Sequence, residues 1–578
     1  MKHCILFSIA ALLFAFRVCQ GGEGVNLHPQ TPPEVWKDYD PDKGDFKEDV
    51  VRSETKDGVF SRDSYISAYV AGGEIRVYCK YAVKVGAMNA PGLLNVHGWM
   101  QTANIDQAYV NDGWAVMSFD YCGKVENRKD YTRYPGSLSH GNMAGPVIHD
   151  SFPGGKSITD PRQSTEYLWY AIQSRALSYL ERQKEVDKNR IGAKGYSYGG
   201  YLMWNLGIDK RVKAIVAYFC SGWVEYYRNK GVWMYNNPYV EPPKSPGEKI
   251  FLAGLAPEAH CPYITAPTLW LNGSNDHAGG HERGCENFKM FKPGVPWDFA
   301  VQARAHHNTE KIGQDCRIWL EKYVLGRDHF WPARPKSTIR LDGDGVPELV
   351  VTPASPERVR KVEFYYALKN PCNFARFWRD TAAPESRGVW VAKMPVLNVE
   401  DYVFGYANIT YDNTVVVSTD FNAAIPAKLG PAKATDTRTD AISVGDGVGA
   451  WTDAAPAEGI GGIKGFRATD NNKGTATDQF NDPKWQPPVG ARLAFRFFCT
   501  EPQTLILTAA NYNECELEIT ASDNWQDMVI PADKLINRFN KQPMKSWTGV
   551  GGIRFMPKAG SDMTKVIFSE VKWVTEKQ

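Results

Sequence analysis

A serine flanked by glycines stands where the sequence predicts a turn from a strand into a helix. Ser197 lies in the pentapeptide Gly195-Tyr-Ser-Tyr-Gly199, which has the pattern G-x-S-x-G. A short apolar run that begins at Arg190 predicts a buried strand, and the residues from Gly199 onward predict the first turns of a helix. A serine on such a sharp turn projects its hydroxyl from the edge of the sheet, and the glycines relieve crowding there. We therefore predict that Ser197 is a nucleophile.

Candidate partners for this serine lie downstream. A serine hydroxyl is a weak nucleophile until a base takes its proton, and that base needs an orienting carboxylate. Asp276 follows one predicted strand, and His306 and His307 follow the next, so both positions lie at strand carboxyl ends, where an open α/β sheet builds its site. The chain order serine, acid, histidine is that of α/β-hydrolases. We predict Asp276 as the acid and His306, the first histidine past the strand, as the base, with His307 as the alternative.

The tetrahedral intermediate of such a reaction needs N–H donors that are already in place. One is expected to be the backbone N–H of Tyr198, directly after the nucleophile. The other is expected from the loop that follows His97-Gly98, from Trp99 or Met100, with Trp99 preferred. Acyl transfer by a serine nucleophile requires neither a metal nor an organic cofactor, and none is predicted.

Strands and helices alternate in the region that carries these residues, about 60–330. Short β-branched runs predict strands, and two longer amphipathic segments predict helices. The predicted strands are 93–96, 115–120, 191–194, 212–218, 268–271 and 299–303, and the predicted helices are 165–186 and 311–325. This alternation predicts an α/β-hydrolase domain with a mostly parallel, doubly wound sheet. An aromatic-rich segment at about 221–261 is predicted to form a lid, and the polar residues 23–59 to form an extended lead-in.

The pattern changes beyond residue 330, where long helical segments disappear. Residues 336–425 carry short alternating runs that predict a small β-sandwich. Residues 426–445 are rich in Ala, Pro, Lys and Thr and are predicted to be a linker. Residues 446–578 form a second all-β region that is dense in Trp and Phe. The α/β domain is thus predicted to be followed by two all-β sandwich domains.

The N-terminus and the overall charge bear on location and partners. Residues 1–22 contain an early apolar run and are predicted to be a secretory signal, so the mature protein is expected to be secreted or periplasmic. That run is too short for a membrane span, and no integral span is predicted in the mature chain. The formal net charge of +2 gives no reason to expect a nucleic-acid partner. The oligomeric state is left open.

Residues 60–325 resemble α/β-hydrolases of the prolyl oligopeptidase and acetyl xylan esterase groups, which include dienelactone hydrolase-like proteins. The resemblance rests on Val186-Asp-Lys-Asn-Arg-Ile-Gly192 before Gly-Tyr-Ser-Tyr-Gly-Gly-Tyr. It also rests on Ala266-Pro-Thr-Leu269 leading to Asp276. It implies the same triad as the chain order does, with either histidine as the base.

The C-terminal region resembles jelly-roll carbohydrate-binding modules in the stretches 525–531 and 566–573. Peptidases of the resembled family generally carry a propeller before the hydrolase domain, whereas only a short segment precedes the first predicted strands here. Together these features favour a secreted serine esterase that removes acetyl or other acyl groups from a polysaccharide. A serine peptidase of the prolyl oligopeptidase type is the first alternative, and a lipase or polyester depolymerase is the second. A binding protein on an inactive hydrolase scaffold is disfavoured because all three triad residue types are present.

Overall fold

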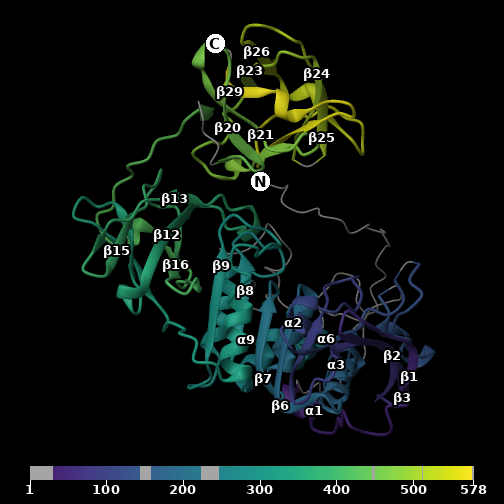
Figure 1. The fold of residues 1–578 in the computed structure, drawn as a ribbon. Helices are drawn as coiled ribbons and strands as arrows, with labels where there is room; N and C mark the ends of the chain where they lie inside the picture. The colour runs from purple at the N-terminus through teal and green to yellow at the C-terminus, as the bar shows by residue number, and fades with distance from the viewer. Residues whose placement is uncertain are drawn as a thin grey trace, which may run out of the picture.

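The computed structural model describes residues 30–125, 127–143, 158–222, 246–444, 450–510 and 512–575. Within them the chain forms three bodies that follow one another in sequence (Figure 1). The predicted secretory signal lies outside the described residues, as does 223–245, the larger part of the aromatic lid predicted at about 221–261. No helix in the described part of the chain is long and apolar enough to cross a membrane.

A nine-stranded sheet forms the first body, in the order β1-β2-β3-β5-β4-β6-β7-β8-β9. The strands from β5 to β9 run parallel, whereas β1, β2 and β3 join the edge as antiparallel strands. Their bounds are β1 (Asp49–Lys56), β2 (Val59–Val70), β3 (Gly73–Lys84), β4 (Ala90–Val96), β5 (Ala115–Phe119), β6 (Val186–Tyr196), β7 (Val212–Tyr218), β8 (Thr268–Gly273) and β9 (Trp297–Gln302). The predicted α/β-hydrolase fold with a mostly parallel sheet is confirmed. The last part of the predicted lead-in, 23–59, belongs to this sheet, because β1 forms the edge strand of the sheet.

Helices cover both faces of this sheet, because successive residues of a buried strand point to opposite sides. In β4, Leu94 belongs to the core that contains α3 and α4, whereas its neighbour Leu93 belongs to the core that contains α2 and α9. The helices are α1 (Pro32–Trp36), α2 (Gln107–Asn111), α3 (Thr165–Glu181), α4 (Tyr198–Leu206), α6 (Pro246–Gly254), α7 (Pro257–His260), α8 (His281–Lys289) and α9 (Asp315–Leu325). The strand ends that carry the site are therefore held in a sheet that is buried on both sides.

Two antiparallel sheets with a shared core form the second body, which is the predicted β-sandwich. Their orders are β10-β11-β15-β14 and β13-β12-β16-β17, with β18 beside β16. The strands are β10 (Lys336–Leu341), β11 (Pro347–Thr352), β12 (Val359–Leu368), β13 (Arg379–Thr381), β14 (Glu385–Ser386), β15 (Val389–Lys393), β16 (Val403–Tyr411), β17 (Val416–Ser418) and β18 (Asn422–Ala424). Trp378, Phe404 and Tyr406 of this body belong to the same core as α3 and α4. Buried apolar surface thus joins the first two bodies.

The third body is a second pair of antiparallel sheets, with the orders β20-β21-β29-β23-β26 and β22-β28-β24-β25-β27, and β19 beside β29. The strands are β19 (Ala441–Val444), β20 (Ala454–Glu458), β21 (Lys464–Ala468), β22 (Thr475–Thr477), β23 (Arg492–Phe498), β24 (Gln503–Ala509), β25 (Asn513–Ile519), β26 (Gln526–Ile530), β27 (Ile536–Asn537), β28 (Ile553–Pro557) and β29 (Ile567–Val574). Trp451, Trp547 and Trp573 lie in its core and are at most 5% exposed. These three indoles therefore stabilise the domain and present no face to solvent.

The predicted linker, 426–445, is ordered where the structure describes it. It begins with a short 3-10 turn, Pro426–Lys428, and then runs along the β-sandwich. The N–H of Lys433 donates to the carbonyl of Gly345 at 2.8 Å, and the N–H of Asp436 donates to the carbonyl of Val396 at 3.1 Å. The third body is consequently attached by a segment that the second body supports.

Candidate active site

Ser197 occupies a strained turn between β6 and α4. Its φ and ψ are 56° and −120°, a conformation that side-chain-bearing residues rarely adopt. A Cβ at Gly195 would collide with the carbonyl oxygen of Gly199, and a Cβ at Gly199 would collide with that of Val96. Both positions of the motif thus require glycine, because neighbouring backbone carbonyls lie where a Cβ atom would stand. The turn holds the serine at the carboxyl end of the sheet, as the motif predicted.

Asp276 and His307 form an acid–base pair on the loops after β8 and β9. Nδ1 of His307 lies 2.5 Å from Oδ2 of Asp276, and the other carboxylate oxygen accepts the N–H of Ala278 at 2.7 Å. Asp276 is fully buried, whereas 31% of the His307 side chain is exposed. When Nδ1 donates its proton to the carboxylate, Nε2 carries the lone pair that a general base needs.

His306, the histidine that the sequence favoured, has a different partner. Its Nδ1 lies 3.0 Å from the backbone carbonyl oxygen of Asn275 and makes no bond to the Asp276 carboxylate. The backbone turns between β9 and the histidines, at Arg304, whose φ is 55°. Counting residues from the strand end could not foresee this turn. The geometry therefore favours His307 as the base, and the preference for His306 is corrected.

Neighbouring strands bring the three candidate triad residues to one edge. The parallel strands β6, β7, β8 and β9 are consecutive in the sheet, and Ser197, Phe219, Asp276 and His307 follow them in that order. The Phe219 ring stacks on the His307 imidazole with their centroids 3.9 Å apart, and it also lies 6.3 Å from the Tyr196 ring. Sequence analysis missed Phe219, which the positive φ of 74° places against the base.

The loop expected to supply the second oxyanion donor lies against the nucleophile. A Cβ at Gly98 would stand 3.3 Å from Cβ of Ser197. Trp99 stays the predicted loop donor beside Tyr198, and its ring lies 4.9 Å from the Tyr198 ring. The amide of Tyr198 is in the first turn of α4, where helix N–H groups have no partner within the helix.

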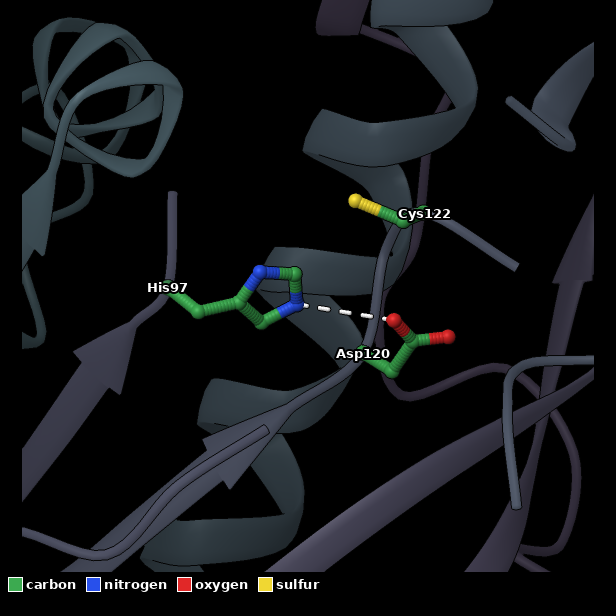
Figure 2. Close-up of side chains that lie close together, drawn as sticks. All are labelled: His97, Asp120 and Cys122. Atoms are coloured by element: carbon green, nitrogen blue, oxygen red, sulfur yellow. Dashed lines mark ion pairs between the residues drawn. The ribbon is translucent and has the colours of Figure 1, made fainter. Parts of the chain in front are cut away.

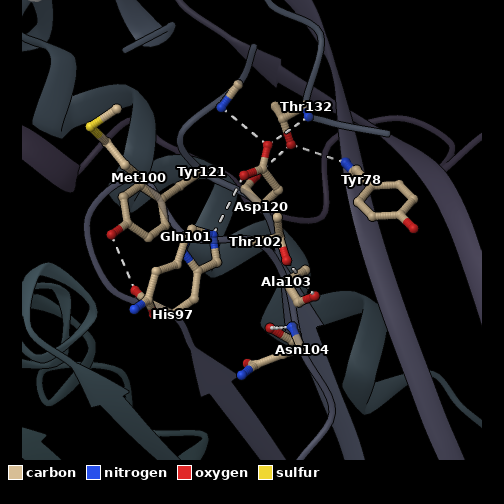
Figure 3. A network of polar contacts seen from close by, with 12 residues as sticks. Tyr78, His97, Met100, Gln101, Thr102, Ala103, Asn104, Asp120, Tyr121 and Thr132 are labelled. Carbon is tan, nitrogen blue, oxygen red and sulfur yellow. Dashed lines mark hydrogen bonds and ion pairs between the residues drawn. The ribbon is translucent and has the colours of Figure 1, made fainter. Parts of the chain in front are cut away.

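A buried His97–Asp120 pair supports the start of this loop (Figure 2). Nε2 of His97 lies 3.5 Å from Oδ1 of Asp120, and Nδ1 lies 2.8 Å from the carbonyl oxygen of Gly98. The imidazole stacks on Tyr121 with centroids 4.4 Å apart, and the Tyr121 hydroxyl donates to the His97 carbonyl. The second Asp120 oxygen accepts the N–H of Thr132 at 2.7 Å (Figure 3). His97 therefore acts as a structural residue of the loop.

Two groups of described side chains place possible metal ligands within 4.8 Å of one another. One consists of Asp276, His277 and His307, where the acid–base bond already engages two members. The other consists of His97, Asp120 and Cys122. Here His97 pairs with Asp120, and burial raises the pKa of the Cys122 thiol. Both groups thus have partners within the protein that account for their proximity.

Known proteins resemble the hydrolase part of this chain. A model of the prolyl oligopeptidase family matches residues 173–323, the segment that carries the candidate triad. No curated protein matches the chain. Acetyl xylan esterase 1 from Thermoanaerobacterium sp. is 18% identical with a TM-score of 0.40, over 48% of this chain and 89% of that one. An acetyl xylan esterase from Paenibacillus sp. is 18% identical with a TM-score of 0.38, over 48% and 88%.

The acylaminoacyl peptidase of Pyrococcus horikoshii is 14% identical with a TM-score of 0.34, over 50% of this chain and 51% of that one. These structures and the family match include both esterases and peptidases. The hydrolase domain of this chain is similar to the prolyl oligopeptidase family, and the protein is a serine hydrolase.

Proposed function

We propose that this serine hydrolase is a secreted esterase that removes acetyl or other acyl groups from a polysaccharide. The observation that carries the proposal is the placement of Ser197, Asp276 and His307 after neighbouring parallel strands, with the acid and the base already bonded. Such a constellation transfers an acyl group to water through a covalent intermediate.

In the proposed mechanism, Nε2 of His307 takes the proton from Oγ of Ser197 as that oxygen attacks the ester carbonyl carbon. Asp276 stabilises the resulting imidazolium. The N–H groups of Tyr198 and Trp99 bind the oxyanion of the tetrahedral intermediate. Collapse breaks the bond to the alcohol, which receives the proton from His307, and an acyl-serine remains. Water then attacks the acyl carbon in the same way, releases the acid and restores the serine.

The polysaccharide substrate is supported by the domain architecture. Two all-β bodies follow the hydrolase domain, and the second resembles jelly-roll carbohydrate-binding modules. Because the core of that body holds three of its tryptophans, contact with sugar rings would fall to more exposed aromatic side chains. Phe539, which is 72% exposed, is one such side chain. Binding of the intact protein to acetylated xylan, compared with the Phe539→Ala variant, tests this part of the proposal.

A serine peptidase is the second candidate, because the matching family model is that of prolyl oligopeptidases. The same triad cleaves esters and amides. The deciding experiment measures kcat/KM for a short acyl ester and for an aminoacyl-proline anilide, with the wild type and Ser197→Ala side by side. Turnover of the ester alone supports the esterase. Comparable turnover of the anilide supports the peptidase, and activity that survives in Ser197→Ala refutes both.

Export is the remaining part of the proposal. It rests on the apolar run within residues 1–22. Expression of the full chain in a bacterium that exports proteins, followed by determination of the mature N-terminus, tests it. Cleavage near Gln20 to Gly22 is expected, and an intact Met1 on the protein in the cytosol would refute it.

A further inference from the structure

We infer that residues 370–379 of the β-sandwich, here called the bridging loop, position the acid–base pair, and that the third body holds this loop in place. The inference rests on the serine-hydrolase mechanism proposed above, and it assigns Asn373 as a positioning residue for Asp276. The catalytic geometry would then depend on all three bodies. The contacts lie on three segments: the acid loop, residues 274–280 between β8 and α8; the base loop, residues 303–314 between β9 and α9; and the third body.

Two buried asparagines tie the bridging loop to the acid loop. Nδ2 of Asn373 donates to the backbone carbonyl of Asp276 at 2.9 Å. In the opposite direction, Nδ2 of Asn275 donates to the carbonyl of Arg376 at 2.6 Å and lies 3.2 Å from that of Phe374. Asn275 and Asn373 are 2% and 1% exposed, so these bonds are shielded from water. The bridging loop thus holds Asp276 in two ways: through the backbone carbonyl of Asp276 itself and through the side chain of its neighbour, Asn275.

A buried ion pair fixes the far end of the acid loop. Arg376 lies 3.1 Å from Glu282 at the start of α8, and the two side chains are 0% and 2% exposed. The Arg376 guanidinium also lies 4.4 Å from the centre of the Phe404 ring. Breaking one partner of a buried pair is costly, because the other charge is left without compensation. The bridging loop therefore holds the acid loop at both its start and its end.

The same loop also reaches the segment that carries the base. Nε of Arg304 donates to the carbonyl of Trp378 at 2.6 Å, and its Nη2 donates to the carboxylate of Asp380 at 2.6 Å. The His306 ring lies 6.2 Å from that of Phe374. Since His307 follows directly, one loop of the second body contacts the segments that carry both members of the acid–base pair.

The third body clamps the opposite side of the bridging loop. Arg379 makes two bonds to the carboxylate of Asp482, at 2.7 and 2.6 Å, and one to that of Asp436 at 2.6 Å. Asp482 is 1% exposed. The Phe377 ring meets Trp485 edge-on at 5.4 Å. Asp436 comes from the segment predicted as a linker, so that segment takes part in the clamp.

Displacement of a catalytic group by about 1 Å can cost as much as 100-fold in rate, even when its cause lies away from the chemistry. Loss of the Asn373 bond should therefore lower kcat with little change in KM, because the bond touches no substrate. Asn413→Ala is the matched control. It removes another side-chain amide of the second body that donates to a backbone carbonyl, that of Phe330 at 2.8 Å, away from the acid loop.

The test compares Asn373→Ala and Asn413→Ala in the full chain, measuring kcat, KM, Tm and the rate of Ser197 labelling by a fluorophosphonate. We expect kcat and the labelling rate to fall about 10- to 100-fold in Asn373→Ala, with KM within about twofold of wild type, and to stay unchanged in Asn413→Ala. Equal loss in both variants, or unchanged kcat in Asn373→Ala, would overturn the positioning role. Asn373→Ser, with an expected intermediate kcat, decides the question if the alanine variant does not fold.

The clamp is tested with Asp482→Asn, which removes a charge but keeps the shape of the pair with Arg379. A fall in kcat with an unchanged KM supports a role for the third body, whereas unchanged kcat refutes it. Labelling by the fluorophosphonate reports on the serine and its base whatever the substrate is. Wild-type protein that labels but does not cleave the ester would therefore refute the esterase proposal while leaving this inference testable.

Discussion

Nδ1 of His307 lies 2.5 Å from Oδ2 of Asp276, which is 31 residues earlier in the chain. The carboxylate is fully buried and the imidazole is partly exposed, so the pair lies across the boundary between protein and solvent. The buried acid can orient the ring from beneath while Nε2 remains accessible from the site. The neighbouring His306 has no bond of this kind, and its Nδ1 faces the carbonyl of Asn275.

Replacement of each histidine by alanine should separate their roles. His307→Ala is expected to lose at least about 1,000-fold in kcat, because it removes the base, whereas His306→Ala should stay within about tenfold of wild type. Steady-state kinetics on the ester, with circular dichroism to verify folding, measure this. The reverse order of effects would show that His306 is the base.

Asp276→Asn should leave the fold intact and reduce kcat by about 10,000-fold, because an amide donor favours the wrong imidazole tautomer. The kcat of the variant at saturating ester is the measurement, with His307→Ala for comparison. Because the residues of a triad act as a unit, the kcat of the double variant Asp276→Asn/His307→Ala should be little lower than that of the less active single variant. Losses that multiply in the double variant would contradict a shared mechanism.

Gly199, two residues after the nucleophile, should tolerate no side chain. In Gly199→Ala the new Cβ would collide with the carbonyl oxygens of Val96 and His97. We expect a loss of about 1–3 kcal/mol in the free energy of unfolding and a larger loss of activity, since the backbone behind Ser197 must shift. Gly343→Ala is the control, because nothing lies within 4 Å of its Cβ. Equal Tm values for the two variants would contradict the required close approach.

Stability should fall as the pH is lowered below the ordinary histidine pKa of 6.5. Burial lowers the pKa of His260 to about 4 and that of His281 to about 3. The unfolded chain therefore takes up protons in this range that the folded chain does not. The contribution of these neutral rings is fully present above pH 6.5 and is lost as the pH falls through the folded-state pKa values.

Thermal unfolding of the wild type and His260→Gln between pH 7 and pH 4 measures this effect. The variant lacks one titrating ring, so its Tm should fall less steeply with decreasing pH. Other groups titrate in the same range, and the difference between the two slopes isolates His260. Parallel curves would mean that His260 has the same protonation in the folded and unfolded chains.

Local patterns determined much of this protein. The run around Ser197 specifies its turn within about ten residues, because the glycines that the turn needs are part of the motif itself. Alternating strands and helices specified a parallel sheet, and short alternating runs after residue 330 specified two antiparallel bodies. The acid was also predictable, since a carboxylate after β8 reaches the same sheet edge as the serine.

Only the tertiary structure decided between the two histidines, because a backbone turn at Arg304 sets which side chain faces the carboxylate. It alone joined Asn373 to Asp276, residues that are 97 positions apart and carry no shared motif. It also showed that the segment 426–444 is supported by hydrogen bonds, although its composition resembles that of a linker. Composition and periodicity record which residues prefer a strand, a helix or a turn. The partners that meet across three bodies depend on how those bodies pack together, which no local pattern contains.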